Sequence, residues 1–305
     1  MRRLPIALTM LALAAGLVIS PSLTGASPAQ RTAPSTSKCG LALGSITAGG
    51  DHAVFRVDAS NPPVVAKKAT PDVYADGSAR LSSRWNVVET ATGSDRQGTV
   101  VLGSGLYNHR YSVTADGALE PGSLTRIGGG WDRFTYFESS TYWYNLTAIR
   151  NDQYGLRNDG VLFRWSVGEA GYWRATGSAT GFAAVKAMAL ISKTSSYDMF
   201  LANTRDGGLY TVRIPVTSPL KPVFTKIRST TWQGFESIVA GRCLDDSTVF
   251  VGIDKDNKSA YAYVMSHAAG TATTIYGMGQ LPHTWADPVY LRWAPESWND
   301  PLFGG

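Results

Sequence analysis

The chain has 305 residues and a mass of 32.7 kDa, so it can form one large domain or two ordinary ones with a sizeable core. Charged residues make up 17% of the sequence, below the roughly 25% of a typical globular protein, while 32 glycines and 9 tryptophans are present. This composition excludes a coiled coil and a charged disordered chain, and it favours an all-β protein with many tight turns.

The first predicted element is a secretory signal peptide at residues 1–26. Arg2 and Arg3 precede an apolar run at 4–19, and small residues near Ala26 resemble a cleavage site. Removing this segment takes away two arginines and no acidic residue, which lowers the formal net charge from +5 to +3. The remaining basic residues are scattered, which argues against a nucleic-acid partner. No later apolar run reaches membrane length, so we expect a secreted, extracellular protein without membrane association.

The next predicted elements are a flexible leader and one disulfide. Residues 27–38 are rich in Ser, Thr, Pro and Ala, a composition typical of a flexible segment. Cys39 and Cys243 are the two cysteines of the chain, and in an oxidising compartment we expect them to be bonded. Closing a loop of about 200 residues would stabilise the fold by roughly 5 kcal/mol. The alternative is two buried free thiols.

A repeat of about 50 residues runs through the sequence from residue 39 to residue 293. One series consists of aromatic residues that are predicted to open a strand: Trp85, Trp131, Phe182, Trp232 and Trp285. A second series consists of alternating strand-like segments centred on Arg56, Arg110, Arg164, Thr211 and Ala262. The two series have the same period, so they predict five structural units.

The signals within each unit indicate four short strands. Asp76-Gly77, Asp116-Gly117, Asp159-Gly160 and Asp206-Gly207 are dipeptides that form tight turns between strands. Residues 182–191 could also form a helix, but the equivalent segments of other units are strand-like, which favours a strand. Asp254 and Asp256 begin like a calcium loop, but Lys258 stands at a ligand position, so a polar hairpin turn is preferred. Four strands per period of this length are typical of a β-propeller blade.

The two ends of the repeat region complement each other. The first unit lacks an opening strand, whereas residues 285–293 supply one that no further unit follows. We therefore predict a five-bladed β-propeller of four-stranded blades at 39–293, closed by joining the N- and C-terminal strands, with a tail at 294–305. Cys39 and Cys243 would then link neighbouring blades at this seam.

Two motifs carry a resemblance to a known family. Gly130-Trp131-Asp132-Arg133-Phe134, followed by Asp159-Gly160-Val161-Leu162-Phe163, resembles the blade pattern of tachylectin-like propellers, Gly-Trp-x-x-Phe and then Asp-Gly-x-Leu-Tyr. Residues 206–210 are a close copy of the second motif, and 231–235 are a weaker copy of the first. Tachylectin-like domains are five-bladed lectins, so the resemblance implies a carbohydrate-binding module that recognises N-acetylated sugars.

The same point of three of the units pairs a tryptophan with a polar residue. A sugar offers hydroxyl groups for planar polar partners and an apolar ring face for an aromatic side chain. These pairs are the predicted carbohydrate-binding residues: Trp131, Asp132, Trp232, Gln233, Trp285 and Asp287. The alternative is that the indole rings pack between blades and their polar neighbours cap strand ends.

The sequence gives less support to a catalytic site or a metal site than to a carbohydrate-binding site. A glycoside hydrolase needs two facing carboxylates, but no spacing pairs the candidates Asp51, Asp58, Glu89, Glu138 and Glu236. No Gly-x-Ser-x-Gly motif occurs, and the four histidines have no metal-ligand spacing: His52, His109, His267 and His283. We expect a monomeric, non-catalytic lectin with repeated weak sites and no cofactor. The alternatives are a propeller that binds proteins or acts as a surface scaffold, and an extracellular glycoside hydrolase.

Overall fold

The structure is a computed structural model that describes residues 39–244, 246–294, 300 and 302–305. The predicted signal peptide (1–26) and leader (27–38) lie outside these residues. The described part of the chain is all-β, and its helical segments are two 3₁₀ turns, η1 (Trp131–Arg133) and η2 (Gly270–Ala272). Among the described residues, no helix is long and apolar enough to cross a membrane.

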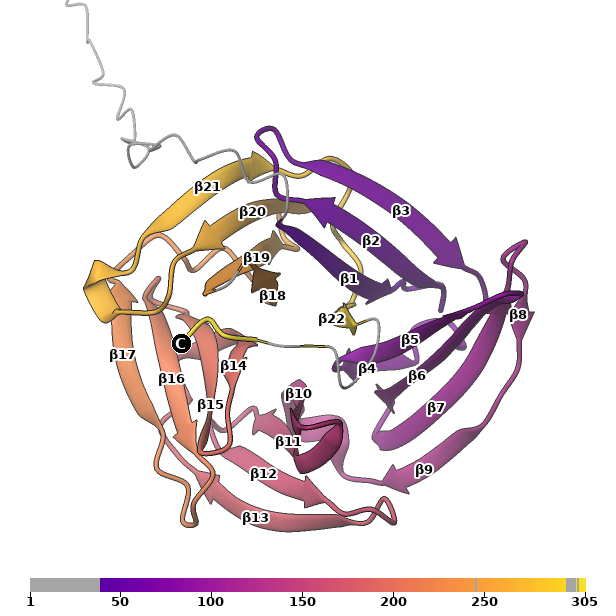
Figure 1. The fold of residues 1–305 in the computed structure, drawn as a ribbon, viewed down its shortest axis with the longest axis horizontal. Helices are drawn as coiled ribbons and strands as arrows, with labels where there is room; N and C mark the ends of the chain where they lie inside the picture. The colour runs from indigo at the N-terminus through magenta and orange to yellow at the C-terminus, as the bar shows by residue number, and fades with distance from the viewer. Residues whose placement is uncertain (1–38, 245, 295–299, 301) are drawn as a thin grey trace, which may run out of the picture. The chain divides into compact units, whose positions relative to one another are not determined.

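The strands form five units that follow one another along the chain, as the colours of Figure 1 show. Unit I combines the first three strands with the last: β1 (Gly40–Ile46), β2 (His52–Asp58), β3 (Val64–Thr70) and β22 (Val289–Ala294). Unit II contains β4 (Ala79–Ser82), β5 (Trp85–Thr90), β6 (Gly93–Leu102), β7 (Gly105–Thr114), β8 (Leu119–Glu120) and β9 (Leu124–Gly128).

The other three units are four-stranded antiparallel sheets whose strands pair in chain order. Unit III contains β10 (Phe134–Tyr144), β11 (Thr147–Arg157), β12 (Leu162–Val167) and β13 (Trp173–Ala179). Unit IV contains β14 (Val185–Lys193), β15 (Tyr197–Thr204), β16 (Leu209–Pro215) and β17 (Val223–Arg228). Unit V contains β18 (Ser237–Cys243), β19 (Ser247–Asp254), β20 (Ser259–Met265) and β21 (Ile275–Gln280). Sheets of this size are consistent with the predicted blades.

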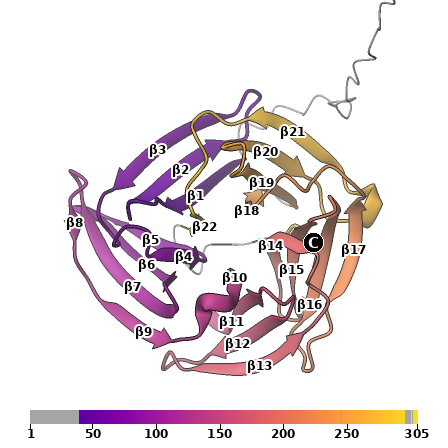
Figure 2. The same cartoon turned by 180° about the vertical axis from the view of Figure 1, so that it is seen from behind.

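Unit I is assembled from distant parts of the chain. β22 pairs antiparallel with β1, with Leu43 opposite Arg292 and Ile46 opposite Val289. It also makes a short parallel contact with β5, where Trp293 lies opposite Trp85, so units I and II share one ten-stranded sheet. Figure 1 and the reverse view in Figure 2 both place β22 between β1 and β5. The C-terminal strand therefore supplies the strand that the first repeat lacks.

Two of the predicted Asp-Gly turns connect the second and third strands of their units. Gly160 lies between β11 and β12 with φ 80°, and Gly207 lies between β15 and β16 with φ 96°. These φ values are left-handed and suit glycine, which explains why the dipeptide marks the turn. In unit V the equivalent turn is the polar hairpin predicted at Asp254, whose Oδ1 accepts a hydrogen bond from Asn257 N (2.8 Å).

A repeated backbone hydrogen bond connects the entry to each unit with a hairpin turn of the unit before it. In each case the acceptor is a backbone carbonyl in a hairpin turn. The five turns connect β1 with β2, β6 with β7, β11 with β12, β15 with β16, and β19 with β20. The five bonds have N···O distances of 3.0–3.1 Å: Tyr74 N to Gly50 O, Trp131 N to Ser104 O, Phe182 N to Gly160 O, Trp232 N to Gly207 O and Trp285 N to Lys258 O.

This bond corrects the aromatic series in two respects. At the entry to unit II the bond is made by Tyr74 and not by Trp85, although Trp85 is the first residue of β5 and so opens a strand as predicted. Trp131, Phe182 and Trp232 do not open strands as predicted, and neither does Trp285, since each lies a few residues before its strand begins. The physical reason is that their N–H groups are bonded to the preceding turn and cannot join a strand ladder. Residues 185–193 do form a strand, as predicted over a helix.

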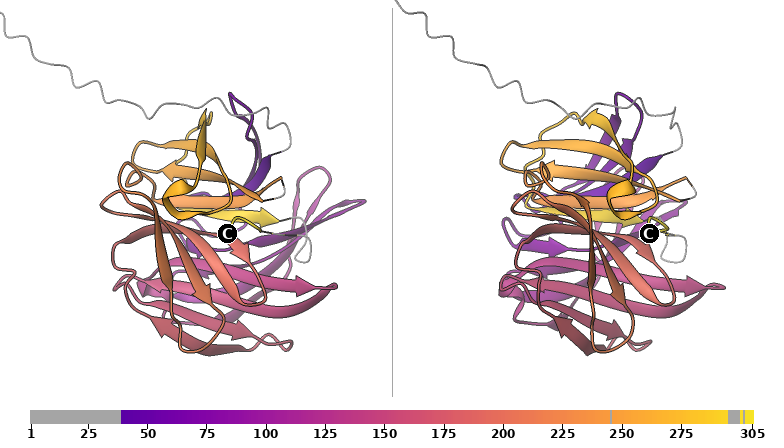
Figure 3. Two further views of the ribbon diagram at one scale, coloured as in Figure 1. Left: turned by 60° about the vertical axis from the view of Figure 1, so that its left-hand side comes forward. Right: turned by 90° about the vertical axis from the view of Figure 1, so that its left-hand side faces the viewer.

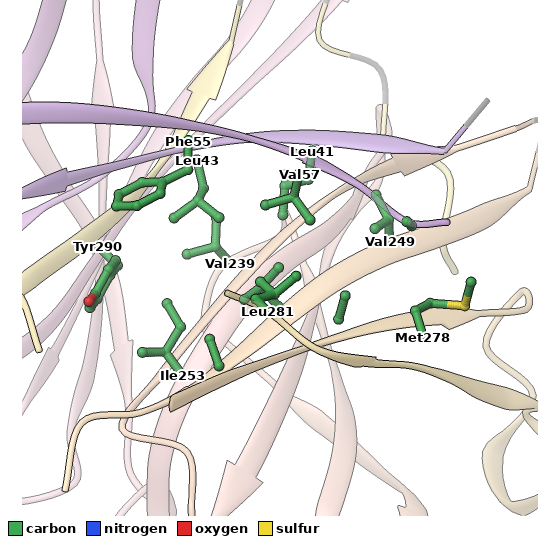
Figure 4. Packing of buried hydrophobic residues seen from close by; sticks show 14 of the residues in the cluster. Leu41, Leu43, Phe55, Val57, Val239, Val249, Ile253, Met278, Leu281 and Tyr290 are labelled. Carbon is green, nitrogen blue, oxygen red and sulfur yellow. The ribbon is translucent and has the colours of Figure 1, made fainter. Parts of the chain in front are cut away.

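Five clusters of buried hydrophobic side chains lie between successive units, and one of them lies between units V and I. Figure 4 shows this cluster, in which Leu43 and Val57 of unit I face Val239 and Ile253 of unit V. Burial of such side chains contributes about 1.5–3 kcal/mol each. The packing between units is therefore the main source of stability for sheets that each have few strands.

The predicted disulfide between Cys39 and Cys243 is confirmed. Cys39 immediately precedes β1 and Cys243 ends β18, so the bond connects unit I with unit V. Both residues are 1% exposed and belong to the cluster between these units.

The last described residues, which the sequence assigned to a tail, pack against unit IV. Leu302 is buried in the cluster between units III and IV, and Gly304 N donates to Ile191 O (2.9 Å). Figure 3 shows the chain end, marked C, close to β14 in its left-hand view. Asp300 forms ion pairs with Arg84, Lys193 and Arg292. Burial lowers the pKa of Lys193 to about 8, while Arg292 and Lys193 overcome burial and hold the pKa of Asp300 far below its ordinary value.

Candidate functional site

The six residues predicted to bind carbohydrate divide into buried rings and accessible polar neighbours. Trp131, Trp232 and Trp285 are 5%, 8% and 0% exposed, and each belongs to a cluster between two units. Asp132 and Gln233 are exposed. Asp287 is half-buried and accepts a hydrogen bond from Ser45 Oγ (2.5 Å). The rings therefore pack between units, as the alternative predicted, and sugar contact at these six positions stays a prediction.

A central pocket of about 200 Å³ receives residues from all five units, at the starts of β4, β10, β14, β18 and β22. A glycosidase in this position would need two carboxylates. Of the described residues that line the pocket, Glu236 alone carries a carboxylate. It forms an ion pair with Lys186 and accepts a hydrogen bond from Lys255 N (2.7 Å). The described lining of the pocket therefore lacks the carboxylate pair.

Two of the histidines come together in an aromatic cluster between units I and II. His52 Nδ1 lies 2.6 Å from Tyr111 Oη, and His109 Nδ1 lies 3.0 Å from Tyr74 Oη. The ring of Trp85 contacts both histidines edge-on. Within the described part of the chain, no group of three or more His, Cys, Asp or Glu side chains could hold a metal ion.

The free energy of unfolding is expected to fall as the pH drops below about 6.5. Burial, with a smaller contribution from Arg96, keeps the pKa of His52 well below its ordinary value of 6.5. The unfolded chain therefore binds a proton that the folded protein does not, which costs up to about 1.4 kcal/mol per pH unit. Denaturant unfolding at several pH values between about 7.5 and 5 measures how steeply the free energy of unfolding changes with pH. His52→Gln should reduce this dependence on pH, whereas the exposed control His267→Gln should not. A wild-type free energy of unfolding that is independent of pH would contradict the expectation.

A cleft of about 980 Å³ lies between units II and III, and we call it the II–III cleft. Strands β5, β6 and β7 and the segment around β9 line one wall. Strands β10 and β11 and the loop from Val167 to Trp173 line the other. The lining is mainly polar and includes amide, hydroxyl and guanidinium side chains.

A chain of hydrogen bonds fixes the polar side chains on the floor of the II–III cleft. Ser139 Oγ donates to Gln153 Oε1 (2.5 Å), and Gln153 Nε2 donates to Asn151 Oδ1 (2.9 Å). Thr141 Oγ1 also donates to Asn151 Oδ1 (3.3 Å). Bonds of this kind hold the amides in fixed orientations, which lowers the entropy lost when a ligand binds.

One polar atom of the cleft is left without a partner. Asn86 Oδ1 is buried and accepts no hydrogen bond from the described residues. A buried acceptor of this kind costs about 1–3 kcal/mol unless a donor reaches it.

The outer wall of the cleft carries two aromatic side chains. Tyr172 is 80% exposed, the largest exposure among the described large hydrophobic residues. Trp173 follows it and is held from behind by Phe137, whose ring is stacked on it at a centroid distance of 6.1 Å, and by Trp131 at 6.4 Å. An apolar face thus stands beside a polar floor, the combination that a sugar ring requires.

Comparison with known proteins finds similar structures but identifies no family for this chain. No family model and no curated protein matches the chain. Among solved structures, BP39L lectin from Burkholderia pseudomallei is similar at 14% identity and TM-score 0.41, covering 79% of this chain and 69% of that one. The fucose-specific lectin from Aleuria aurantia is similar at 12% identity and TM-score 0.41, covering 81% of each chain.

An enzyme is similar to the same degree. The catalytic domain of the GH62 alpha-L-arabinofuranosidase from Coprinopsis cinerea has 12% identity and TM-score 0.42, covering 73% of this chain and 76% of that one. Similarities this weak assign neither a family nor a ligand to the chain. The tachylectin-like resemblance therefore stays a prediction.

The residues of the II–III cleft were not among the sequence predictions, although some left a local signal. Ser139 and Thr141 lie two residues apart on β10, and Asn151 and Gln153 lie two residues apart on β11. Residues at this spacing point to the same face of a strand. Paired polar residues on one face of a strand mark a polar surface, but they do not say which other strand faces it.

Proposed function

We propose that this chain is a secreted, monomeric and non-catalytic β-propeller lectin with five blades. The five units, the pairing of β1 with β22 and the hydrophobic cluster between units V and I support a closed ring. A disulfide between distant parts of the chain supports an oxidising, extracellular destination. The alternative is a propeller that serves as a scaffold for proteins.

The II–III cleft is the observation that supports carbohydrate binding. Its floor presents amide and hydroxyl groups held by hydrogen bonds, and Tyr172 and Trp173 supply an apolar wall. The cleft volume of about 980 Å³ is within the range that binds small molecules. An N-acetylated sugar suits this chemistry, because the amide and hydroxyl groups of the floor can form hydrogen bonds with its acetamido and hydroxyl groups.

The glycosidase alternative receives less support from the residues. The central pocket contains one carboxylate among the described residues, and that carboxylate is occupied by Lys186 and the backbone of Lys255. In the II–III cleft, Glu169 is the sole carboxylate among the lining residues. Among the lining residues that the structure describes, neither space has the pair of carboxylates that glycosidic hydrolysis uses.

A glycan array followed by calorimetry with an oligomer of N-acetylglucosamine tests the proposal. Tyr172→Ala is expected to weaken binding roughly tenfold, because it removes the exposed ring that would stack on the sugar. Asn86→Ala should also weaken binding while leaving the fold intact. Tyr144→Ala is the matched control, since Tyr144 is 62% exposed but does not line the cleft. Absence of binding to every glycan, or binding unchanged in both cleft variants, would contradict the proposal.

The six residues of the sequence prediction are tested by the same measurement. Asp132→Ala and Gln233→Ala change exposed side chains beside buried tryptophans. Repeated weak sites at Trp131, Trp232 and Trp285 would give about three sugars per chain, whereas the II–III cleft alone gives one. Loss of binding in these variants, with the cleft variants unaffected, would place the sugar at the repeated position.

A further inference from the structure

A second groove, with a volume of about 400 Å³, lies between units I and II and shares no lining residue with the II–III cleft. We call it the I–II groove. Strands β2 and β3 form one wall, and the β5–β6 hairpin with the end of β7 forms the other. Trp293 of β22 also lines the groove.

The I–II groove has a strong excess of positive charge. Four cations and one carboxylate line it: Arg56, Lys67, Lys68, Arg96 and Glu89. Within the described part of the chain, none of these five side chains takes part in an ion pair. The positive potential is therefore not neutralised locally, and the groove attracts an anion.

The side chain of Arg96 is held in a fixed position in the groove. Its Nη1 donates to Thr70 Oγ1 (2.8 Å), and its Nε donates to Ser94 Oγ (3.2 Å). Its guanidinium lies over the rings of Trp293 and Tyr111, at 5.2 and 5.7 Å from their centroids. Arg96 is 7% exposed, so its conformation is set by these contacts rather than by solvent.

One nitrogen of this guanidinium remains for a ligand. Nη2 makes no hydrogen bond to the described residues. It is not among the buried polar atoms that lack a partner, so Nη2 is in contact with solvent. A guanidinium held in place loses little entropy when it binds an oxyanion, and the resulting hydrogen bond is charge-assisted. Arg56 and Lys68 are exposed on the opposite wall and can add further contacts to the same anion.

The remaining lining suits the body of a sugar. Thr90, Ser94 and Thr114 bring hydroxyl groups, while Val87 and Val113 bring apolar surface. The volume of the groove is sufficient for one or two rings. We propose that the I–II groove is a second binding site that takes the oxyanion group of an acidic saccharide, a carboxylate or a sulfate, on Arg96 Nη2; that the ligand is a saccharide rests on the proposed function.

Calorimetry with trigalacturonate, its fully methyl-esterified neutral form and inorganic sulfate tests this site. We expect trigalacturonate to bind at low salt, the neutral ester to bind at least tenfold more weakly, and the affinity to fall as NaCl is added. Arg96→Gln should abolish the preference for the acid. Because Arg96 is buried, Arg56→Gln and Lys68→Gln on the exposed wall serve as second variants, each expected to weaken binding several-fold. Lys221→Gln, an exposed change in unit IV, is the matched control.

The outcomes separate this site from the first one. Equal binding of the acid and the ester would overturn the proposal, as would acid binding that Tyr172→Ala removes and the three I–II groove variants leave intact. In both cases the lectin proposal survives. Sulfate binding that depends on Arg96, without binding of any saccharide, would overturn the saccharide assignment and the proposed function together.

Discussion

Asp198→Ala is expected to lower the free energy of unfolding by about 3–5 kcal/mol, because it removes one partner of a buried ion pair. Asp198 lies on β15 of unit IV, and its side chain is 0% exposed. Arg150 of unit III donates two hydrogen bonds to its carboxylate, at 2.5 and 2.8 Å. Tyr154 Oη and Ser140 Oγ donate to the same carboxylate, each at 2.7 Å.

The size of this effect follows from what the substitution leaves behind. Burial opposes the charge of Arg150, but Asp198 and Asp152 outweigh it and keep the pKa of Arg150 above its ordinary value. Without Asp198, Arg150 would keep a single carboxylate partner, and the buried hydroxyl of Tyr154 would lose its acceptor. All four donor atoms belong to side chains on one face of unit III, whereas the carboxylate that accepts these hydrogen bonds belongs to unit IV. The substitution of Asp198 therefore weakens the contact between units III and IV.

Guanidinium chloride unfolding followed by tryptophan fluorescence measures the loss. Asp198→Asn retains an acceptor oxygen and should cost less than Asp198→Ala. Asp95→Ala is the control, because Asp95 is exposed and accepts one hydrogen bond from Ser112; we expect a change within about 0.5 kcal/mol. A loss below about 1 kcal/mol for Asp198→Ala would show that the network is not a significant source of stability.

Removal of the disulfide by the double change Cys39→Ala and Cys243→Ala is expected to cost roughly 5 kcal/mol in the chain-entropy model. The bond spans a sequence separation of 204 residues, so it restricts the unfolded chain strongly. The structural contacts between units I and V remain in the variant, since the hydrophobic cluster at this position includes many other side chains. The loss should therefore appear as lower stability of the same fold.

Equilibrium unfolding of the oxidised protein, the reduced protein and the double variant checks this expectation. The reduced protein and the variant should have similar denaturation midpoints, both below that of the oxidised protein. Alkylation of the native, non-reduced protein followed by mass spectrometry should find no free thiol. Equal midpoints for all three samples, or two labelled cysteines, would refute the contribution assigned to the bond.

Features determined by local chemistry could be predicted from the sequence. Asp159-Gly160 and Asp206-Gly207 form the expected turns, because a left-handed residue is needed there whatever surrounds it. The disulfide was predictable because the chain has two cysteines. Trp85 opens a strand as predicted, but the residue that makes the repeated backbone bond at this junction is Tyr74. Both rings are buried at the same junction, and spacing alone does not separate them.

The candidate sites could be predicted far less well. The II–III cleft combines Asn86 of one unit with Asn151 and Tyr172 of the next, and the I–II groove joins Arg56 to Arg96. Such pairs lie on different sheets, so their proximity depends on how the units pack. The predicted tryptophans repeat because they pack at each junction and because their backbone bonds a preceding turn. A periodic residue of this kind reports the architecture rather than the ligand.

The pairing of β1 with β22 has a consequence for biosynthesis. β1 begins at Gly40, early in synthesis, whereas its partner β22 begins at Val289. The edge of β1 that pairs with β22 therefore stays unpaired on the ribosome until β22 has been made. An unpaired edge strand is a template for pairing with other chains. We expect fragments that end before β22 to aggregate, and the native state to form after the last strand has emerged.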